Sequence, residues 1–113
     1  MGLDLFAGIP VTDYTAALPW YEQFFGGSPA FLPTDTEAVW MVAEHRYIYI
    51  VQDPLRAGNA LVLSFVDDLD DRIATIAQRG IEPAKRETYD NGVTKVIYRD
   101  AEGNEISFGG RLG

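Results

Sequence analysis

Apolar and polar residues follow two kinds of spacing along the chain, and both kinds occur twice in the same order. Leu5–Val11 is a short apolar run that predicts a strand, and Asp13 after it suits the start of a helix. Apolar residues then recur at helical spacing, which predicts a helix that begins near Thr15 and ends at Gly26. Three extended segments follow, at 29–33, 37–44 and 46–53. The first half therefore predicts one strand, one helix and three more strands.

The same order of elements restarts after a loop that contains glycine. The pattern predicts a strand at 60–68, a helix at 69–80, and strands at 81–89, 92–100 and 104–110. An offset of 55 residues places Phe6 on Leu61 and superposes the two halves. Because each half is too short to bury its own sheet face, we predict a single domain, 1–113, made of two modules, 1–55 and 56–113.

The composition narrows the range of partners and locations. The chain has 113 residues, a formal net charge of −8 and no cysteine. The lack of cysteine excludes disulfides and thiolate metal sites, and it favours a reducing cytoplasm. The negative charge opposes binding to phosphate backbones and anionic lipids, so we expect neither nucleic acid nor membrane as a partner. No apolar run approaches the ~20 residues of a membrane span. These properties predict a soluble cytoplasmic protein.

Four motifs carry a resemblance to a known superfamily. They are IPVTD at 9–13, WYEQFFG at 20–26, FVDDLD at 65–70 and YRDAEGNEISF at 98–108. In this order and spacing they resemble the vicinal oxygen chelate superfamily, which contains glyoxalases, extradiol dioxygenases and bleomycin-resistance binding proteins. The resemblance implies an α+β fold, in which two βαβββ modules form a U-shaped, eight-stranded mixed sheet around a cavity. It also implies a homodimer.

The same resemblance implies where metal ligands would lie. Metal-using members carry a histidine or glutamine on the first strand of each module and a glutamate on the last strand. The first-strand positions correspond to Phe6 and Leu61 here, and the final one corresponds to Ser107. The fourth position falls on Tyr49 or Gln52. Divalent cations need carboxylate oxygens, imidazole or thiolate, so we expect no metal and no other cofactor.

Other candidates for chemistry are weak. His45 is the only histidine and lies in a polar turn between two predicted strands, where an exposed side chain is expected. The aspartates at 67–71 suit a helix start, and they lack the glycine and distal glutamate of a calcium loop. No nucleophile elbow, phosphate-binding loop or dinucleotide motif is present. We therefore predict no catalytic residue.

Period-two alternation sorts the strand residues between a helix-facing side and a side that faces the cavity. It places Phe6, Trp40, Tyr49, Leu61 and Phe65 on the cavity side, with Ser107 and a lone carboxylate, Glu105, near them. These seven residues are the predicted ligand-binding site, since apolar and aromatic linings with few polar groups are typical of ligand pockets. In the alternative interpretation, the same aromatic side chains fill the hollow or a dimer interface.

Two functions follow from these observations. The first is a metal-free small-molecule-binding protein of the glyoxalase/bleomycin-resistance type, which sequesters an aromatic or cationic ligand or antibiotic. The alternative is an enzyme. It would be a metal-dependent lyase or oxygenase with non-standard ligands, or a metal-free isomerase that relies on Glu105. The apolar residues at the metal positions favour the binding protein.

Overall fold

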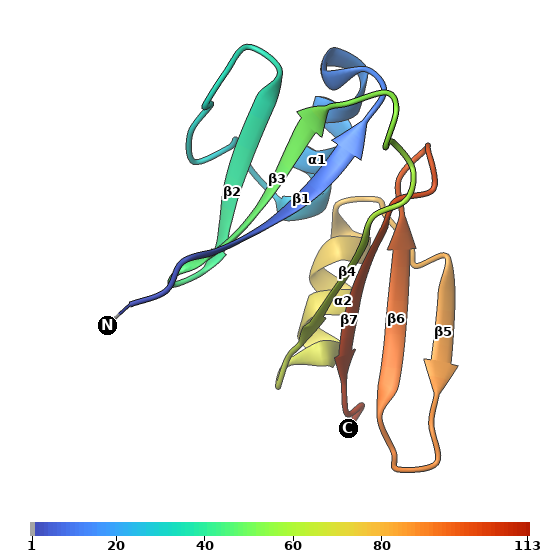
Figure 1. The fold of residues 1–113 in the computed structure, drawn as a ribbon. Helices are drawn as coiled ribbons and strands as arrows, with labels where there is room; N and C mark the ends of the chain where they lie inside the picture. Colours follow the sequence, from blue (N-terminus) through green and yellow to red (C-terminus); the bar gives the residue numbers. More distant parts are fainter. Residues whose placement is uncertain (1) are drawn as a thin grey trace.

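The two halves of the chain repeat one arrangement, in which a helix follows the first strand (Figure 1). The computed structural model describes residues 2–113. The first half contains β1 (Leu5–Val11), α1 (Tyr14–Phe25), β2 (Glu37–Ala43) and β3 (Arg46–Gln52). The second half contains β4 (Leu61–Phe65), α2 (Leu69–Gln78), β5 (Lys85–Thr88), β6 (Thr94–Arg99) and β7 (Glu105–Gly110). The predicted α+β class is confirmed.

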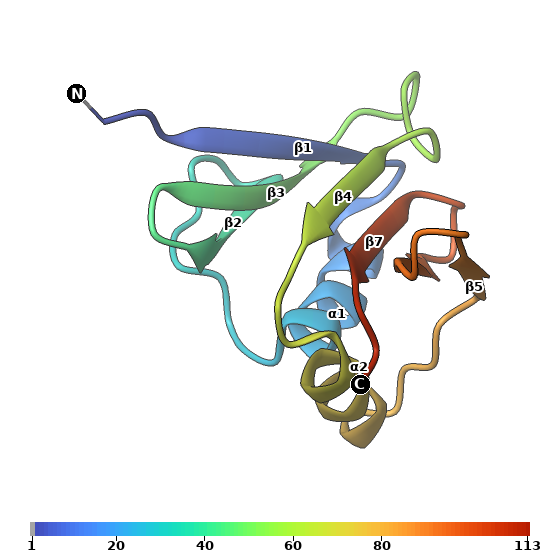
Figure 2. The ribbon, with the colours of Figure 1, turned by 90° about the horizontal axis from the view of Figure 1, so that it is seen from below.

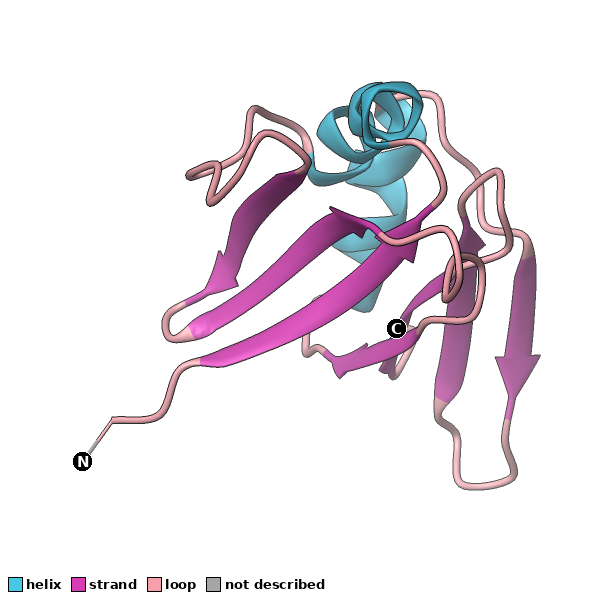
Figure 3. Cartoon of the chain, turned by 45° about the horizontal axis from the view of Figure 1, so that its top comes forward, coloured by secondary structure: helices cyan, strands magenta, loops and turns pink. Residues whose placement is uncertain are grey.

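The strands form two mixed sheets (Figure 3). The strand orders are β1-β3-β2 and β4-β7-β6-β5, and each first strand runs parallel to the last strand of its own half. The remaining neighbours pair antiparallel. Residues 2–113 thus contain seven strands, close to the predicted U of eight. None of the described helices is long and apolar enough to cross a membrane.

The missing eighth strand is the segment predicted at 29–33. It forms only an isolated bridge between Phe31 and Val39, beside β2. Pro29 and Pro33 flank the bridge, and proline has no amide hydrogen to donate to a ladder. Pairing therefore stops after one bridge.

Helix α1 begins where the sequence pattern places a cap. The Asp13 carboxylate accepts hydrogen bonds from the backbone amides of Thr15 and Ala16, at 3.1 and 3.3 Å. This bonding satisfies amides that have no partner within the helix. The helix continues through Pro19 and ends at Gly26.

The core forms around α1, which packs between the two sheets. The Phe24 ring lies 5.2 Å from the Tyr98 ring on β6 and 6.2 Å from the Phe108 ring on β7, measured between centroids. On the other side, the Tyr21 ring lies 6.2 Å from that of Trp40 on β2. Figure 2 shows the sheets as an arch with both helices on its inner side. The inner sides of both sheets are therefore buried in one core.

The opposite side of each sheet, called the outer face here, turns away from the helices. In β1, Ile9 and Val11 are fully buried on the inner side, while Phe6, predicted to face away from the helix, is 45% exposed on the outer face. The outer side chains of β4 are exposed as well. Alternation therefore assigned the faces of β1 and β4 correctly.

Phe24→Ala should test the shared core. The ring is 1% exposed and contacts both halves, so its loss should lower the free energy of unfolding by about 3–5 kcal/mol. Leu55→Ala is the control, because Leu55 is 96% exposed. Chemical denaturation followed by circular dichroism measures both variants. A loss at Phe24 no larger than that at Leu55 would contradict this packing.

Candidate functional site

The outer face of the first sheet carries a cluster of aromatic rings. Phe6 stacks on Tyr47, with ring centroids 4.4 Å apart and planes 10° from parallel. The Tyr49 ring covers Gly8 on the neighbouring strand so closely that a Cβ at position 8 would lie 2.7 Å from its Cζ. Beside Tyr49 is a cavity of about 430 Å³. It runs from β1 and β3 to the loop before β4, where Arg56 forms a 2.7 Å ion pair with Asp53. A flat ligand could stack on this face.

The outer face of the second sheet is apolar along β4. Leu61 is 80% exposed, Leu63 is 51% exposed and Phe65 is 67% exposed. The Phe65 ring covers Gly109 on β7, where a Cβ would lie 2.7 Å from the ring. These three side chains leave a large apolar strip open to solvent.

The two polar residues predicted for this face are less available than expected. Arg99 lies opposite Glu105 in the ladder, and its Nε is 3.1 Å from the Glu105 carboxylate. Glu105 is therefore half of an ion pair, and the prediction of a lone carboxylate was wrong. Ser107 pairs with Leu63 and Ile97 and is only 3% exposed. Ser107 is therefore almost closed to solvent.

Strand register identifies the fourth metal position that the sequence left open. Phe6 and Leu61 are equivalent, and two residues after each of them Gly8 pairs with Tyr49 and Leu63 pairs with Ser107. The fourth position is therefore Tyr49. None of these positions carries a carboxylate or imidazole, so the residues do not fit the family's metal.

Residues outside those positions do not assemble a metal site either. Within residues 2–113, no group of three or more histidine, cysteine, aspartate or glutamate side chains could hold an ion. His45 lies in an exposed turn at φ 62°, where its Nδ1 is 2.6 Å from the Asp4 carboxylate. Its position agrees with the expected exposed turn.

The predicted orientation of Trp40 was wrong. Trp40 pairs with Ile48 on the inner side of the sheet, and only 5% of it is exposed. Its indole Nε1 donates a 3.0 Å hydrogen bond to the Gly27 carbonyl at the end of α1. Val39 and Met41 occupy the outer face of β2 instead, because neighbouring strand residues point to opposite sides. Trp40 belongs to the core.

One chain does not bring the predicted site together. Phe6 and Tyr49 lie on the outer face of the first sheet, whereas Leu61, Phe65, Glu105 and Ser107 belong to β4 and β7 of the second. Because the helices lie inside the arch, the two outer faces turn away from each other (Figure 2). Within one chain, the two outer faces therefore cannot line the same hollow.

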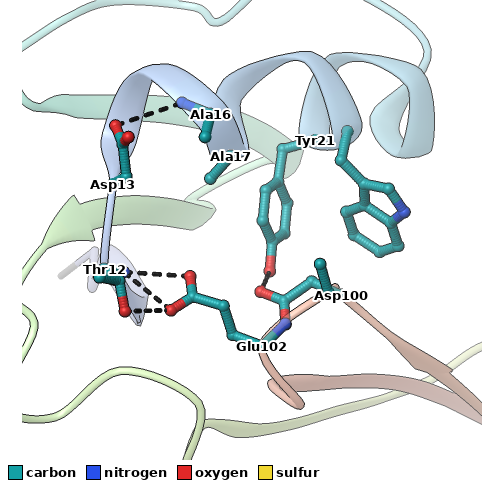
Figure 4. A pocket seen from close by; sticks show the side chains of 9 residues that line it. Thr12, Asp13, Ala16, Ala17, Tyr21, Asp100 and Glu102 are labelled. Carbon is teal, nitrogen blue, oxygen red and sulfur yellow. Dashed lines mark hydrogen bonds between the residues drawn. The ribbon is translucent and has the colours of Figure 1, made fainter.

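Sequence reasoning missed a cavity of about 390 Å³ between the start of α1 and the β6–β7 turn (Figure 4). The Thr12 amide donates to both Glu102 carboxylate oxygens, at 2.9 and 3.0 Å, and its hydroxyl also contacts that carboxylate. The Tyr21 hydroxyl donates a 2.7 Å hydrogen bond to Asp100. Burial and the Asp100 carboxylate raise the pKa of Tyr21, so its phenol stays protonated. The contacts join the two halves.

Asn104 completes this connection. Its side-chain nitrogen donates to the Pro10 carbonyl at 2.9 Å and to Asp100 at 2.8 Å. Its side-chain oxygen accepts a 3.0 Å hydrogen bond from the Ala60 amide. The sequence pattern places Asn104 at the start of a predicted strand and indicates no role for it. In the structure Asn104 is fully buried, so its side chain needs these partners.

Comparison with known proteins places this arrangement in a family. A crystal structure of a glyoxalase/bleomycin resistance protein from Catenulispora acidiphila DSM 44928 is 49% identical, with a TM-score of 0.91 over 98% of this chain and 100% of that one. The chain belongs to the glyoxalase/bleomycin resistance protein family. The resemblance to the vicinal oxygen chelate superfamily is thereby confirmed.

More distant structures share the fold. A lactoylglutathione lyase from Agrobacterium tumefaciens is 17% identical, with a TM-score of 0.75 over 97% of this chain and 94% of that one. A bleomycin resistance determinant encoded on the transposon Tn5 is 14% identical, with a TM-score of 0.73 over 99% of this chain and 100% of that one. No protein-family model and no curated protein matched the chain.

Two tyrosines offer a matched test of the junction between the halves. The Tyr21 hydroxyl bonds Asp100, whereas the Tyr98 hydroxyl is buried and finds no partner in residues 2–113. Tyr21→Phe should therefore lower the free energy of unfolding by about 1.5–3 kcal/mol, and Tyr98→Phe should leave it unchanged or raise it slightly. Denaturant titration of both variants measures this difference. Equal losses in the free energy of unfolding would show that the hydrogen bond from Tyr21 to Asp100 does not stabilise the fold.

Proposed function

We propose that this family member is a small-molecule-binding protein that works without a metal ion. The observation that carries the proposal is the replacement of all four metal positions by Phe6, Tyr49, Leu61 and Ser107. Two of these residues are aliphatic or phenyl side chains on exposed surface, and Ser107 is buried. Phe6 and Leu61 can contact an apolar ligand, and none of the four positions offers an anionic ligand to a cation. We also propose the cytoplasm as its location, because the chain has no cysteine.

The ligand class that we propose is a flat aromatic molecule, including cationic antibiotics. Phe6 and Tyr47 present a stacked pair, and Phe31 meets Tyr47 edge-on with centroids 6.5 Å apart. Aromatic faces attract both aromatic rings and cations. The net charge of −8 draws cations to the protein over longer distances. Sequestration of such a compound requires affinity alone and no reaction.

We propose that a second copy of the chain completes the ligand site. The strands β1 and β4 each pair with one neighbour only, and both carry exposed apolar side chains on the outer face. Exposed apolar patches and open strand edges are typical of interfaces. In a homodimer, the first sheet of one chain could face the second sheet of its partner. That arrangement would bring Phe6 and Leu61 to the same hollow from different chains.

The enzyme alternative finds less support in the site. An isomerase that relied on Glu105 would need a free carboxylate, and this one is paired with Arg99. A lyase or oxygenase would need a ligand cluster that residues 2–113 do not assemble.

Calorimetric titration against a panel of flat, cationic and aromatic antibiotics tests the binding proposal. At least one compound should bind with a dissociation constant well below millimolar. Phe6→Ala removes one ring of the stack and should weaken the binding of that compound about tenfold. Leu112→Ala is the control, since Leu112 is also partly exposed but lies in the C-terminal segment after β7. No binding below millimolar across the panel would reject the proposal.

The oligomeric state in solution tests separately whether a second copy of the chain completes the site. Light scattering at micromolar concentration should give twice the mass of one chain. Leu61→Arg places a charge in the proposed interface and should yield a folded monomer, because burial of an unpaired charge is costly. Leu112→Arg should remain dimeric. A wild-type monomer over the whole accessible concentration range would contradict the proposal.

A further inference from the structure

We propose a second small-molecule site, which takes an apolar molecule carrying one acidic group. The site is a cavity of about 570 Å³ between the end of the β2–β3 hairpin and the end of β4, beside the last turn of α1. It lies mainly against the inner side of the sheets and shares no residue with the 430 Å³ cavity of the outer face. The inference does not rest on the function proposed above.

Four aromatic side chains form the walls of this cavity: Phe25, Trp40, Phe65 and Phe108. Phe25 and Trp40 pack together with ring centroids 5.0 Å apart. Trp40 is also fixed by its hydrogen bond to Gly27. Trp40 and Phe108 belong to the core and Phe25 packs against it, whereas Phe65 is 67% exposed on β4. Because three of the four walls are fixed in this way, a flat apolar body can enter without reorganising them, and few side chains lose freedom on binding.

The charged residues that line the cavity are both arginines, Arg46 and Arg72, and no carboxylate lines it. Within residues 2–113, Arg46 has no acidic side chain at salt-bridge distance. Arg72 donates from Nε to Asp68 at 2.8 Å, and its guanidinium lies 5.5 Å from the centre of the Phe108 ring. One of the two guanidinium charges is therefore uncompensated, in a chain whose net charge is −8.

These two features together define the ligand. A guanidinium offers paired N–H donors that match a carboxylate, sulfonate or phosphate group. Aromatic walls beside it bury the rest of the molecule. A cationic compound suited to the outer face would be repelled here by Arg46. The two sites thus select opposite charges.

Two dyes with the same ring system test the proposal. 1-Anilinonaphthalene-8-sulfonate carries a sulfonate, and N-phenyl-1-naphthylamine lacks it. The sulfonate dye should bind once per chain with increased fluorescence. Arg46→Gln should weaken the binding of the sulfonate dye about tenfold and leave the binding of the neutral dye unchanged. Arg86→Gln removes an exposed charge outside the cavity and should change the affinity for neither dye.

A second variant locates the site. Ser64 lines the cavity from β4. Ser64→Phe should therefore fill part of the cavity and weaken the binding of both dyes. Phe6 does not line the cavity, so Phe6→Ala should leave the affinity for the sulfonate dye unchanged, which separates this site from the one proposed above. The proposal is overturned if Arg46→Gln leaves the affinity for the sulfonate dye intact, if Arg86→Gln lowers it equally, or if Ser64→Phe has no effect.

Discussion

The packing of one helix against two sheets determines the rest of the structure. Phe24 of α1 contacts rings of β6 and β7, and Tyr21 of the same helix contacts Trp40 of β2. Because the helices fill the inner side of the arch, the outer faces are left to solvent (Figure 2). Apolar residues on those faces do not stabilise this core. Polar contacts of Asp100, Glu102 and Asn104 hold the two halves in the same relation.

This arrangement is compatible with the metal-free binding function proposed above. The four positions lie on outer faces or just beneath them, where they contribute little to the core. Side chains such as Phe6, Tyr49, Leu61 and Ser107 at these positions are therefore compatible with the same fold, while they change the chemistry of the face. The inner cavity beside Arg46 has the opposite character, since most of its aromatic walls belong to the core or pack against it and its charged side chains are positive.

Much of the fold could be predicted because its signals are local. Alternation in β1 and β4 identified their faces, and Asp13 marked the start of α1. The segment 37–44 misled the assignment of Trp40, because β2 is apolar on both sides and period two cannot fix its register there. Pairings such as Glu105 with Arg99 depend on strand register, so they could not be identified from spacing along one segment. The position of α1 between two sheets likewise follows from tertiary packing and not from any local pattern.

The most direct test of the central claim is the metal content of the protein. The chain should be purified without chelators, incubated with excess Zn²⁺, Ni²⁺, Mn²⁺ or Fe²⁺, desalted, and then analysed by plasma mass spectrometry. Since its metal positions hold phenyl, phenol, isobutyl and hydroxyl groups, the account predicts retained metal far below one ion per chain. Retention of one of these ions at one per chain, in a form that only a chelator removes, would contradict it.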